Sequence, residues 1–171
     1  MANILIVDDD EISLEVLSGM LSREGHTCLL ASNREEASEF MTASNKIELM
    51  LCDVNLPEGS GLDLIKPALL KPNNTAAIMV TGVDDPKVAK SALRRGAYDY
   101  ITKPITLNRV LISLENALRR RQLEIANRNY QEDLERMIVQ RTAKLQKAFE
   151  GTIQATALTV EWRDPYTAGH Q

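Results

Sequence analysis

Short apolar runs alternate with amphipathic stretches over the first 105 residues of the chain. Five runs of four to six residues, each bounded by turn or cap residues, are typical of buried strands. They lie at residues 3–7, 27–31, 48–52, 76–81 and 98–101. Because strands that alternate with helices form a parallel sheet covered on both faces, the pattern predicts a doubly wound α/β fold. We expect a flavodoxin-like sheet of five parallel strands in the order 2-1-3-4-5.

Cap and stop residues place the helices between these strands. The first predicted helix covers residues 10–24, and the second begins near Asn33, a good N-cap residue. The fourth begins with Asp85 as its cap and ends at Gly96. The third has Pro67 where a helix interior should be, so we expect a kinked or short helix there.

The rest of the chain has a helical pattern without strands. One helix from Thr106 to Glu150 would be about 68 Å long at 1.5 Å per residue, more than twice the width of a small domain. Its first part has an apolar stripe that can pack on the sheet as a fifth helix. A second stripe, in a shifted register, contains Leu123, Tyr130, Leu134, Ile138, Leu145 and Phe149. We expect a parallel homodimer that buries this stripe in a coiled coil, with Arg141 making its heptads imperfect.

Composition argues against two kinds of nucleic-acid binding. The net charge of −4 has the wrong sign for neutralising phosphates, and 4% aromatic residues are too few for base stacking. The N-terminus lacks the pattern of a signal peptide, and no window approaches the roughly 18 apolar residues of a membrane span. We expect a cytoplasmic protein that binds neither nucleic acid nor a membrane, with Cys28 and Cys52 as buried, reduced thiols.

Acidic residues directly follow two of the predicted strands. Asp8, Asp9 and Asp10 come after the first strand, and Asp53 comes after the third. In the expected order these strands are neighbours about 4.8 Å apart, at the point where a parallel sheet forms its crevice. Like charges this close resist joint ionisation unless a cation lies between them. Mg²⁺ or Mn²⁺ fits such a site, because these ions prefer oxygen ligands.

Two other polar side chains belong to the same edge of the sheet. Thr81 ends the fourth predicted strand, and Lys103 follows the fifth. With the cation, they can neutralise the oxygens of a transferring phosphoryl group while a carboxylate attacks phosphorus in line. We interpret Asp53 as that nucleophile and expect Thr81 to move towards the phosphoryl group once it is attached.

The residues at these strand ends carry a family resemblance. The segments ILIVDDDE at 4–11, LCDVNLP at 51–57, VTG at 80–82 and YITKP at 100–104 resemble the receiver domain of two-component response regulators. The resemblance covers about residues 1–120. It implies a sensor histidine kinase as the partner that supplies the phosphoryl group.

The resemblance also implies roles for individual residues. Asp53 would be the phosphoacceptor and a metal ligand, Asp9 a direct ligand of the metal, and Asp8 a ligand through water. The backbone carbonyl of Asn55 would complete the protein's share of the metal site.

Further roles concern the phosphoryl group and the response to it. Thr81 and Lys103 would bind the phosphoryl group, Tyr100 would be an aromatic switch, and the Lys103–Pro104 bond would be cis. The chain departs from the family in Gly82 and in the proline of the third helix, which leaves the chemistry intact but makes local geometry less certain.

The C-terminal residues carry a second resemblance. Residues 158–171 resemble the opening of an HD-GYP domain, a family of metal-dependent phosphodiesterases that act on cyclic di-GMP. We therefore expect a receiver domain at 1–120, a helical coiled-coil linker at 121–155, and the truncated start of an HD-GYP output domain at 156–171. His170 matches a metal ligand of that family, but its His-Asp pair and Gly-Tyr-Pro segment are missing here. This chain is thus not expected to be an enzyme, whereas the intact protein is expected to be a phosphodiesterase.

Two alternatives remain open from the sequence. Asp8 and Asp10 match the Asp-x-Asp pattern of haloacid dehalogenase phosphatases, in which Asp8 would carry the phosphoryl group, although Glu11 and Ile12 depart from that pattern. The other alternative is a pure oligomerisation module, in which the acidic residues have no chemical role. Chemical labelling of the phosphorylated aspartate and magnesium-dependent binding of beryllofluoride distinguish these hypotheses.

Overall fold

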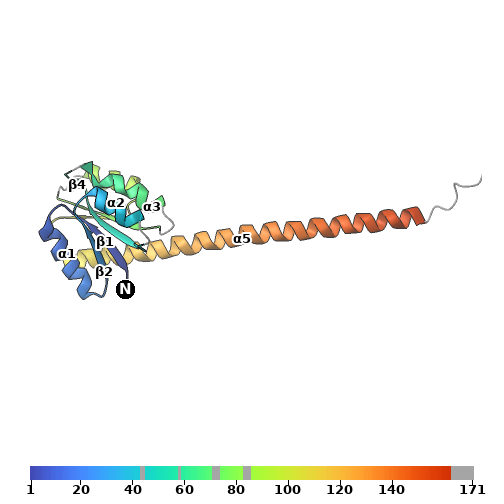
Figure 1. Cartoon of the computed structure of the whole chain (residues 1–171), viewed down its shortest axis with the longest axis horizontal. Helices are drawn as coiled ribbons and strands as arrows, with labels where there is room; N and C mark the ends of the chain where they lie inside the picture. The colour runs from blue at the N-terminus through green and yellow to red at the C-terminus, as the bar shows by residue number, and fades with distance from the viewer. Residues whose placement is uncertain (43–44, 58, 71–73, 83–85, 163–171) are drawn as a thin grey trace, which may run out of the picture. The chain divides into compact units, whose positions relative to one another are not determined.

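The computed structural model contains a five-stranded parallel sheet and describes residues 1–42, 45–57, 59–70, 74–82 and 86–162. The strand order β2-β1-β3-β6-β7 confirms the predicted order 2-1-3-4-5 (Figure 1). Two strands begin and end one residue later than predicted. The bounds are β1 (Asn3–Val7), β2 (Thr27–Ala31), β3 (Leu49–Asp53), β6 (Ala76–Thr81) and β7 (Asp99–Thr102). A short hairpin of β4 (Asn55–Leu56) and β5 (Gly59–Ser60) was not predicted.

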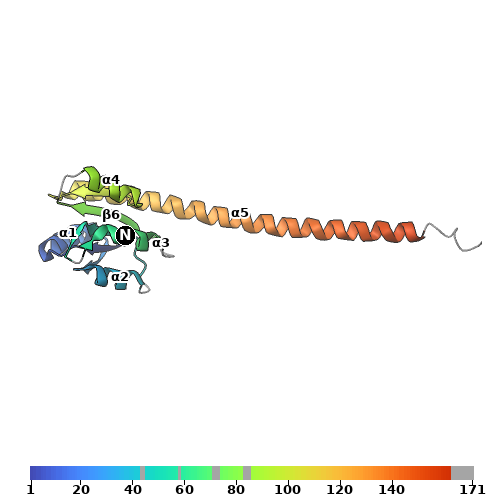
Figure 2. The ribbon, with the colours of Figure 1, turned by 90° about the horizontal axis from the view of Figure 1, so that it is seen from above.

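Helices cover both faces of the sheet, as the doubly wound class requires. One face packs against α1 and the beginning of α5, and the other packs against α2, α3 and α4. In Figure 2, α2 and α4 lie towards opposite edges of the sheet. The bounds are α1 (Glu11–Arg23), α2 (Arg34–Thr42), α3 (Ile65–Leu70), α4 (Pro86–Arg94) and α5 (Leu107–Trp162).

Local chemistry explains where these helices begin and end. Asp10 caps α1, since its carboxylate accepts hydrogen bonds from the backbone N–H groups of Ile12 and Ser13. The third helix is short, as predicted, and follows a 3₁₀ turn at Gly61–Leu64. Pro67 lies in its first turn, where its missing N–H has no helical acceptor. Asp85, the predicted cap of α4, lies outside the described residues.

The helix predicted to end at Glu150 continues to Trp162, so its predicted end was too early. A single glycine, Gly151, weakens a helix by about 1 kcal/mol relative to alanine but does not end it. The chain divides into two compact units, residues 1–125 and 126–171. The first part of α5 therefore belongs to the unit that contains the sheet.

Polar contacts hold this first part of α5 in place. The guanidinium group of Arg121 donates a hydrogen bond of 2.8 Å to the carbonyl oxygen of Asn74 and lies 3.6 Å from the carboxylate of Glu48. The hydroxyl of Tyr98 donates to Glu124, and the guanidinium of Arg120 lies 4.5 Å from the centre of the Tyr98 ring. Burial and the hydrogen bond to Glu124 raise the pKa of Tyr98 to about 12.

This raised pKa gives an alkaline stability dependence. Because unfolded tyrosine ionises near pH 10, the contribution of Tyr98 to the free energy of unfolding is present below pH 10 and lost as the pH rises through about 12. Tyr98→Phe should cost about 0.5–1.5 kcal/mol at pH 8. Urea unfolding at several pH values should show this difference shrinking above pH 10. A difference that stays constant from pH 8 to pH 12 would contradict the assignment.

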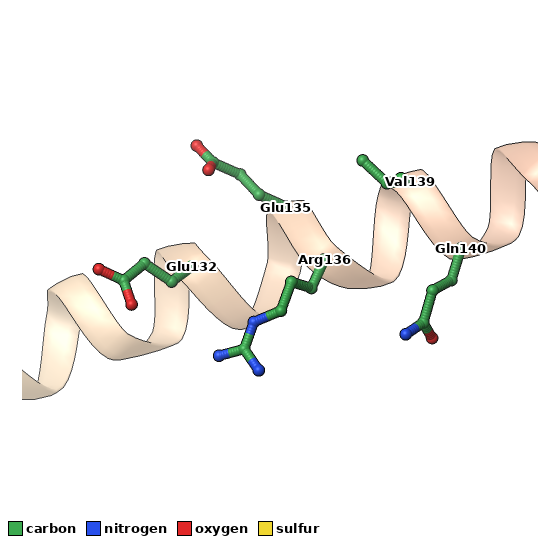
Figure 3. Close-up of a pocket in the computed structure, with 5 residues that line it drawn as sticks. All are labelled: Glu132, Glu135, Arg136, Val139 and Gln140. Atoms are coloured by element: carbon green, nitrogen blue, oxygen red, sulfur yellow. The ribbon is translucent and has the colours of Figure 1, made fainter.

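The second unit is described as a single helix from residue 126 to residue 162. Its large apolar side chains from Tyr130 to Ile153 are exposed. A hollow of about 540 Å³ lies on its surface and is lined by Glu132, Glu135, Arg136, Val139 and Gln140. Figure 3 shows these five side chains along the helix. All five come from consecutive turns of one helix, so the hollow is an open surface groove. Of the described helices, none combines the length and the apolar character needed to cross a membrane.

Candidate phosphoryl-acceptor site

Four strands bring the predicted site residues to one edge of the sheet. Asp8 directly follows β1, Asp53 and Thr81 are the last residues of β3 and β6, and Lys103 follows β7. These strands are consecutive neighbours in the sheet, and parallel strands end at the same edge. Residues that are up to 95 positions apart in the sequence therefore meet in space.

Lys103 joins the two buried carboxylates at this edge. Its Nζ donates a hydrogen bond of 2.5 Å to Oδ2 of Asp53 and one of 2.9 Å to Oδ2 of Asp8. Asp8 is only 2% exposed and Asp53 only 6%. Buried carboxylates need a counter-charge, and the ammonium group supplies it to both.

The second oxygen of each carboxylate is held by the backbone. Oδ1 of Asp8 accepts a hydrogen bond of 3.0 Å from the N–H of Asp10, and Oδ1 of Asp53 accepts one of 2.8 Å from the N–H of Asn55. Each side chain thus has one oxygen fixed by its own loop and one shared with Lys103. This arrangement orients both carboxylates before any ligand binds.

Two opposing effects act on the lysine. Burial lowers the pKa of Lys103, but the hydrogen bonds to Asp53 and Asp8 together outweigh it and leave this pKa above its usual value. The ammonium form is therefore the stable form at neutral pH. Two carboxylates and one ammonium group leave the cluster with a net negative charge.

This donor set fits a divalent cation. The two carboxylates and nearby backbone carbonyls are the oxygen ligands that Mg²⁺ prefers, and Asp9 adds an exposed carboxylate next in the chain. Among the described residues, no three acidic, histidine or cysteine side chains cluster closely enough to form a metal cage. Mg²⁺ does not need such a cage, because it is typically bound by one or two carboxylates and keeps several waters.

Replacing Lys103 tests whether it is the counter-charge of this cluster. Lys103→Met leaves two buried carboxylates without a cation and should lower the free energy of unfolding by about 1–3 kcal/mol at neutral pH, since the site is partly open to solvent. Urea unfolding measures the change. Lys90→Met, at an exposed position of α4, is the matched control and should change stability by less than about 0.5 kcal/mol. Equal stability of the two variants would contradict this role.

Close backbone packing fixes the loop that follows Asp53. The N–H of Val54 donates to the carbonyl of Val80 at 2.8 Å, and the N–H of Gly61 donates to the carbonyl of Val54 at 2.9 Å. A Cβ atom on Gly61 would lie 1.9 Å from the carbonyl oxygen of Asp53 and 2.7 Å from Sγ of Cys52. Only glycine fits this position. This role of Gly61 was not predicted from the sequence, although Gly59-Ser60-Gly61 is a turn signal.

The two cysteines differ in their surroundings. Cys52 is buried, as predicted, whereas Cys28 is only half-buried and corrects the prediction for that residue. Its edge strand, β2, has partly open positions because it has a neighbour on one side only. Burial raises the pKa of both thiols, so both are mostly protonated at neutral pH.

Thr81 and Tyr100 lie on the strands beyond Asp53. The side chain of Thr81 is buried, and its carbonyl accepts a hydrogen bond of 2.8 Å from the N–H of Lys103. Tyr100 is half-buried against the core and borders a surface hollow of about 500 Å³ beside α4. The Lys103–Pro104 peptide bond is cis, which confirms the prediction.

The geometry gives no support to the phosphatase alternative. That hypothesis needs the carboxylate of Asp10 at the site together with Asp8. The carboxylate of Asp10 instead accepts hydrogen bonds from Ser13 and the first turn of α1. These hydrogen bonds, first of all the one from Ser13, lower the pKa of Asp10 and hold its carboxylate at the helix cap.

Comparisons with known proteins agree with this fold. The model of the response regulator receiver domain family matches residues 4–115. The chain is 30% identical over 143 residues to the cyclic di-GMP phosphodiesterase of Thermotoga maritima, an alignment that covers 82% of this chain and 38% of that relative. The curated relatives it matches are longer proteins, of which the chain spans between 27% and 56%.

Two solved structures have the same fold. A response regulator from Burkholderia pseudomallei, with a phosphorylated aspartic acid, a calcium ion and citrate, is 31% identical with a TM-score of 0.63, over 75% of each chain. The beryllofluoride-activated NtrC4 receiver domain dimer is 27% identical with a TM-score of 0.65, over 71% of this chain and 99% of that one. Since the family model spans more than half of the residues and the sheet has the expected order, the chain belongs to the response regulator receiver domain family.

Proposed function

We propose that this protein is a phosphorylation-dependent switch in which Asp53 accepts a phosphoryl group from a sensor histidine kinase or a small phosphodonor. The observation that carries the proposal is the pair of buried carboxylates, Asp8 and Asp53, held on the ammonium group of Lys103. One oxygen of Asp53 is fixed by the N–H of Asn55. The other is within reach of a cationic group that can also bind a phosphoryl oxygen.

In the transfer, a carboxylate oxygen of Asp53 forms the new bond to phosphorus while the bond from phosphorus to the donor's leaving atom breaks. Lys103 then exchanges its contact with Asp53 for one with a phosphoryl oxygen, and Thr81 supplies a hydroxyl at the same edge. The donor keeps the electron pair of the broken bond, and a donor imidazole takes up a proton from solvent.

Asp9, Asp53 and the backbone carbonyl of Asn55 would hold a Mg²⁺ or Mn²⁺ ion directly, and Asp8 would hold it through water. When bound, the ion neutralises negative charge on the transferring group. The net negative charge of the cluster and its oxygen ligands support this assignment. The related Burkholderia pseudomallei protein contains a calcium ion together with a phosphorylated aspartic acid.

An apolar surface beside the site can receive the kinase. The exposed side chains of Ile12 and Val16 on α1 line a hollow of about 250 Å³ together with Pro104 and Ile105. Lys103 also lines this hollow, so a partner docked there lies next to the acceptor site. Exposed apolar side chains around a polar centre are typical of protein interaction sites.

Phosphorylation then changes the surface around β7, the edge strand nearest to α4. Thr81 and Tyr100 are on the neighbouring strands β6 and β7, and Tyr100 borders the hollow beside α4. A hydroxyl that moves towards the phosphoryl group leaves space that the Tyr100 ring can fill. The face formed by α4, β7 and the first part of α5 is thereby remodelled.

The helix beyond residue 125 carries the response through a parallel homodimer. The domain division proposed is a receiver at 1–120, a linker at 121–155 and the start of an output domain at 156–171, of which residues 163–171 lie outside the described part. His170, which matches a metal ligand of the HD-GYP family, falls in that segment. The relative from Thermotoga maritima supports a cyclic di-GMP phosphodiesterase as the output of the intact protein.

A matched pair of variants tests the dimer. Ile138 and Val139 are adjacent and similarly exposed, at 62% and 68%, but only Ile138 lies on the apolar stripe. Ile138→Glu should raise the dissociation constant of the dimer at least about 100-fold, because it puts a charge into a buried seam. Val139→Glu should leave this constant within about threefold. Sedimentation with and without beryllofluoride measures both, and a parent protein that is monomeric in both states excludes the dimer.

A further inference from the structure

The exposed apolar side chains of α5 recur at intervals of eleven residues. Leu134 and Leu145 are eleven residues apart, and so are Ile138 and Phe149. Tyr130 extends the same face, with Arg141 eleven residues after it. All of these apolar side chains are exposed on the described helix, from 37% for Leu134 to 71% for Leu145. They form one continuous face, which we call the seam.

A seven-residue repeat does not accommodate this face. Positions of a heptad seam are separated by multiples of seven, or by three or four more than such a multiple. Tyr130 and Phe149 are 19 residues apart, five more than two heptads, so one heptad register cannot contain both. A heptad that contains Leu134 and Leu145 places Gln131 and Ala148 in the seam instead. The eleven-residue repeat includes every large apolar residue of the face.

We propose that a second copy of this chain pairs with α5 through this eleven-residue seam, in parallel and in register. Eleven residues in three turns give 3.67 residues per turn, close to the 3.6 of an unstrained helix. The paired helices should therefore be nearly straight with a slight right-handed twist, and not a left-handed coiled coil. The inference rests on the homodimer proposed above and specifies how its helices meet.

Charge supports a second copy as the occupant. Projected at the spacing of the repeat, the seam and its immediate borders contain no acidic residue between 130 and 156, and Arg141 is the only charge. Glu135 lies just outside these borders, on the side of the seam opposite to Arg141. In a parallel pair, the Arg141 side of each helix lies against the Glu135 side of the other helix. Each Arg141 therefore faces Glu135 of the partner subunit. In an antiparallel pair, the two Arg141 sides would lie together, and so would the two Glu135 sides.

Cysteine cross-linking of the full chain distinguishes the repeats. In a Cys28→Ala background, Tyr130→Cys and Phe149→Cys place a thiol in the eleven-residue seam. Gln131→Cys and Ala148→Cys are the matched neighbours that a heptad would place there. A disulfide needs Cβ atoms about 3.5–4.5 Å apart, so mild oxidation should link seam positions at least about fivefold faster than their neighbours. Non-reducing gels give the rates, and sedimentation of each reduced variant gives the fraction of dimer.

Each result has a defined meaning. Fast linking of both Tyr130→Cys and Phe149→Cys supports the proposal, including the parallel direction, because each thiol must meet its own copy. Fast linking of Gln131→Cys and Ala148→Cys overturns the eleven-residue seam but leaves the dimer intact. A dimer in sedimentation without self-linking at any of the four positions overturns the parallel arrangement. Monomers throughout overturn the proposed homodimer itself.

Discussion

Asp53→Asn should abolish phosphorylation by small phosphodonors such as acetyl phosphate, reducing the rate by at least about 1,000-fold. The amide that replaces the carboxylate is not a nucleophile towards phosphorus. Its oxygen can still accept the hydrogen bond from the N–H of Asn55, and one of two crowded buried carboxylates is removed. We therefore expect the free energy of unfolding to stay within about 1 kcal/mol of the parent or to rise. Loss of reaction with retained stability identifies a chemical role.

Phosphoprotein gel analysis and magnesium-dependent binding of beryllofluoride measure this loss. Asp63→Asn is the control, because Asp63 is an exposed acid that pairs with Arg34 and Arg95 away from the site. It should be phosphorylated at the parental rate. Phosphorylation that persists in Asp53→Asn and maps to Asp8 by borohydride labelling would restore the phosphatase alternative. A parent that binds no beryllofluoride would favour the oligomerisation module.

Gly61→Ala should damage both stability and phosphorylation. The added methyl group would lie 1.9 Å from the carbonyl oxygen of Asp53 and 2.7 Å from Sγ of Cys52, and the first of these is backbone that cannot rotate away. The loop or the end of β3 must therefore move. We expect a loss of about 3 kcal/mol in the free energy of unfolding, at the upper end of the range for overpacking. Because Asp53 is displaced by the same movement, phosphorylation should slow by at least about tenfold.

Gly19→Ala is the control for a methyl group added at a glycine. Gly19 is in the interior of α1, and no atom outside the local helix backbone lies within 4 Å of the added Cβ, so alanine should stabilise the helix by about 0.5–1 kcal/mol. Thermal unfolding compares the two variants. If both variants gained stability, Gly61 would not be the close backbone contact described above.

The sheet could be predicted because each strand has a recognisable pattern of apolar residues in the sequence. Buried strands such as β3 and β6 are continuous apolar runs, and each ends in a polar residue, Asp53 or Thr81. The doubly wound order then brings Asp8 next to Asp53 without any knowledge of side-chain contacts. The edge that carries the site thus follows from periodicity and topology alone.

Contacts that depend on loop paths could not be predicted. Nothing in the sequence indicates that Lys103 reaches two carboxylates, because this depends on the path of the chain after β7. The role of Gly61 arises from its close approach to the backbone of Asp53. The pattern of hydrophobic residues carries no information about such a contact. The contacts of Arg121 with Asn74 and Glu48 join segments far apart in the chain.

The ammonium group between Asp8 and Asp53 has a consequence for the resting protein. Because the chain carries its own counterion, the folded state does not rely on an external ion for its integrity. If Mg²⁺ binds as proposed, its concentration should change the rate at which Asp53 is phosphorylated, while the amount of folded protein stays constant. The rate of phosphorylation and the stability of the folded domain are thereby controlled separately, although both depend on the same few side chains.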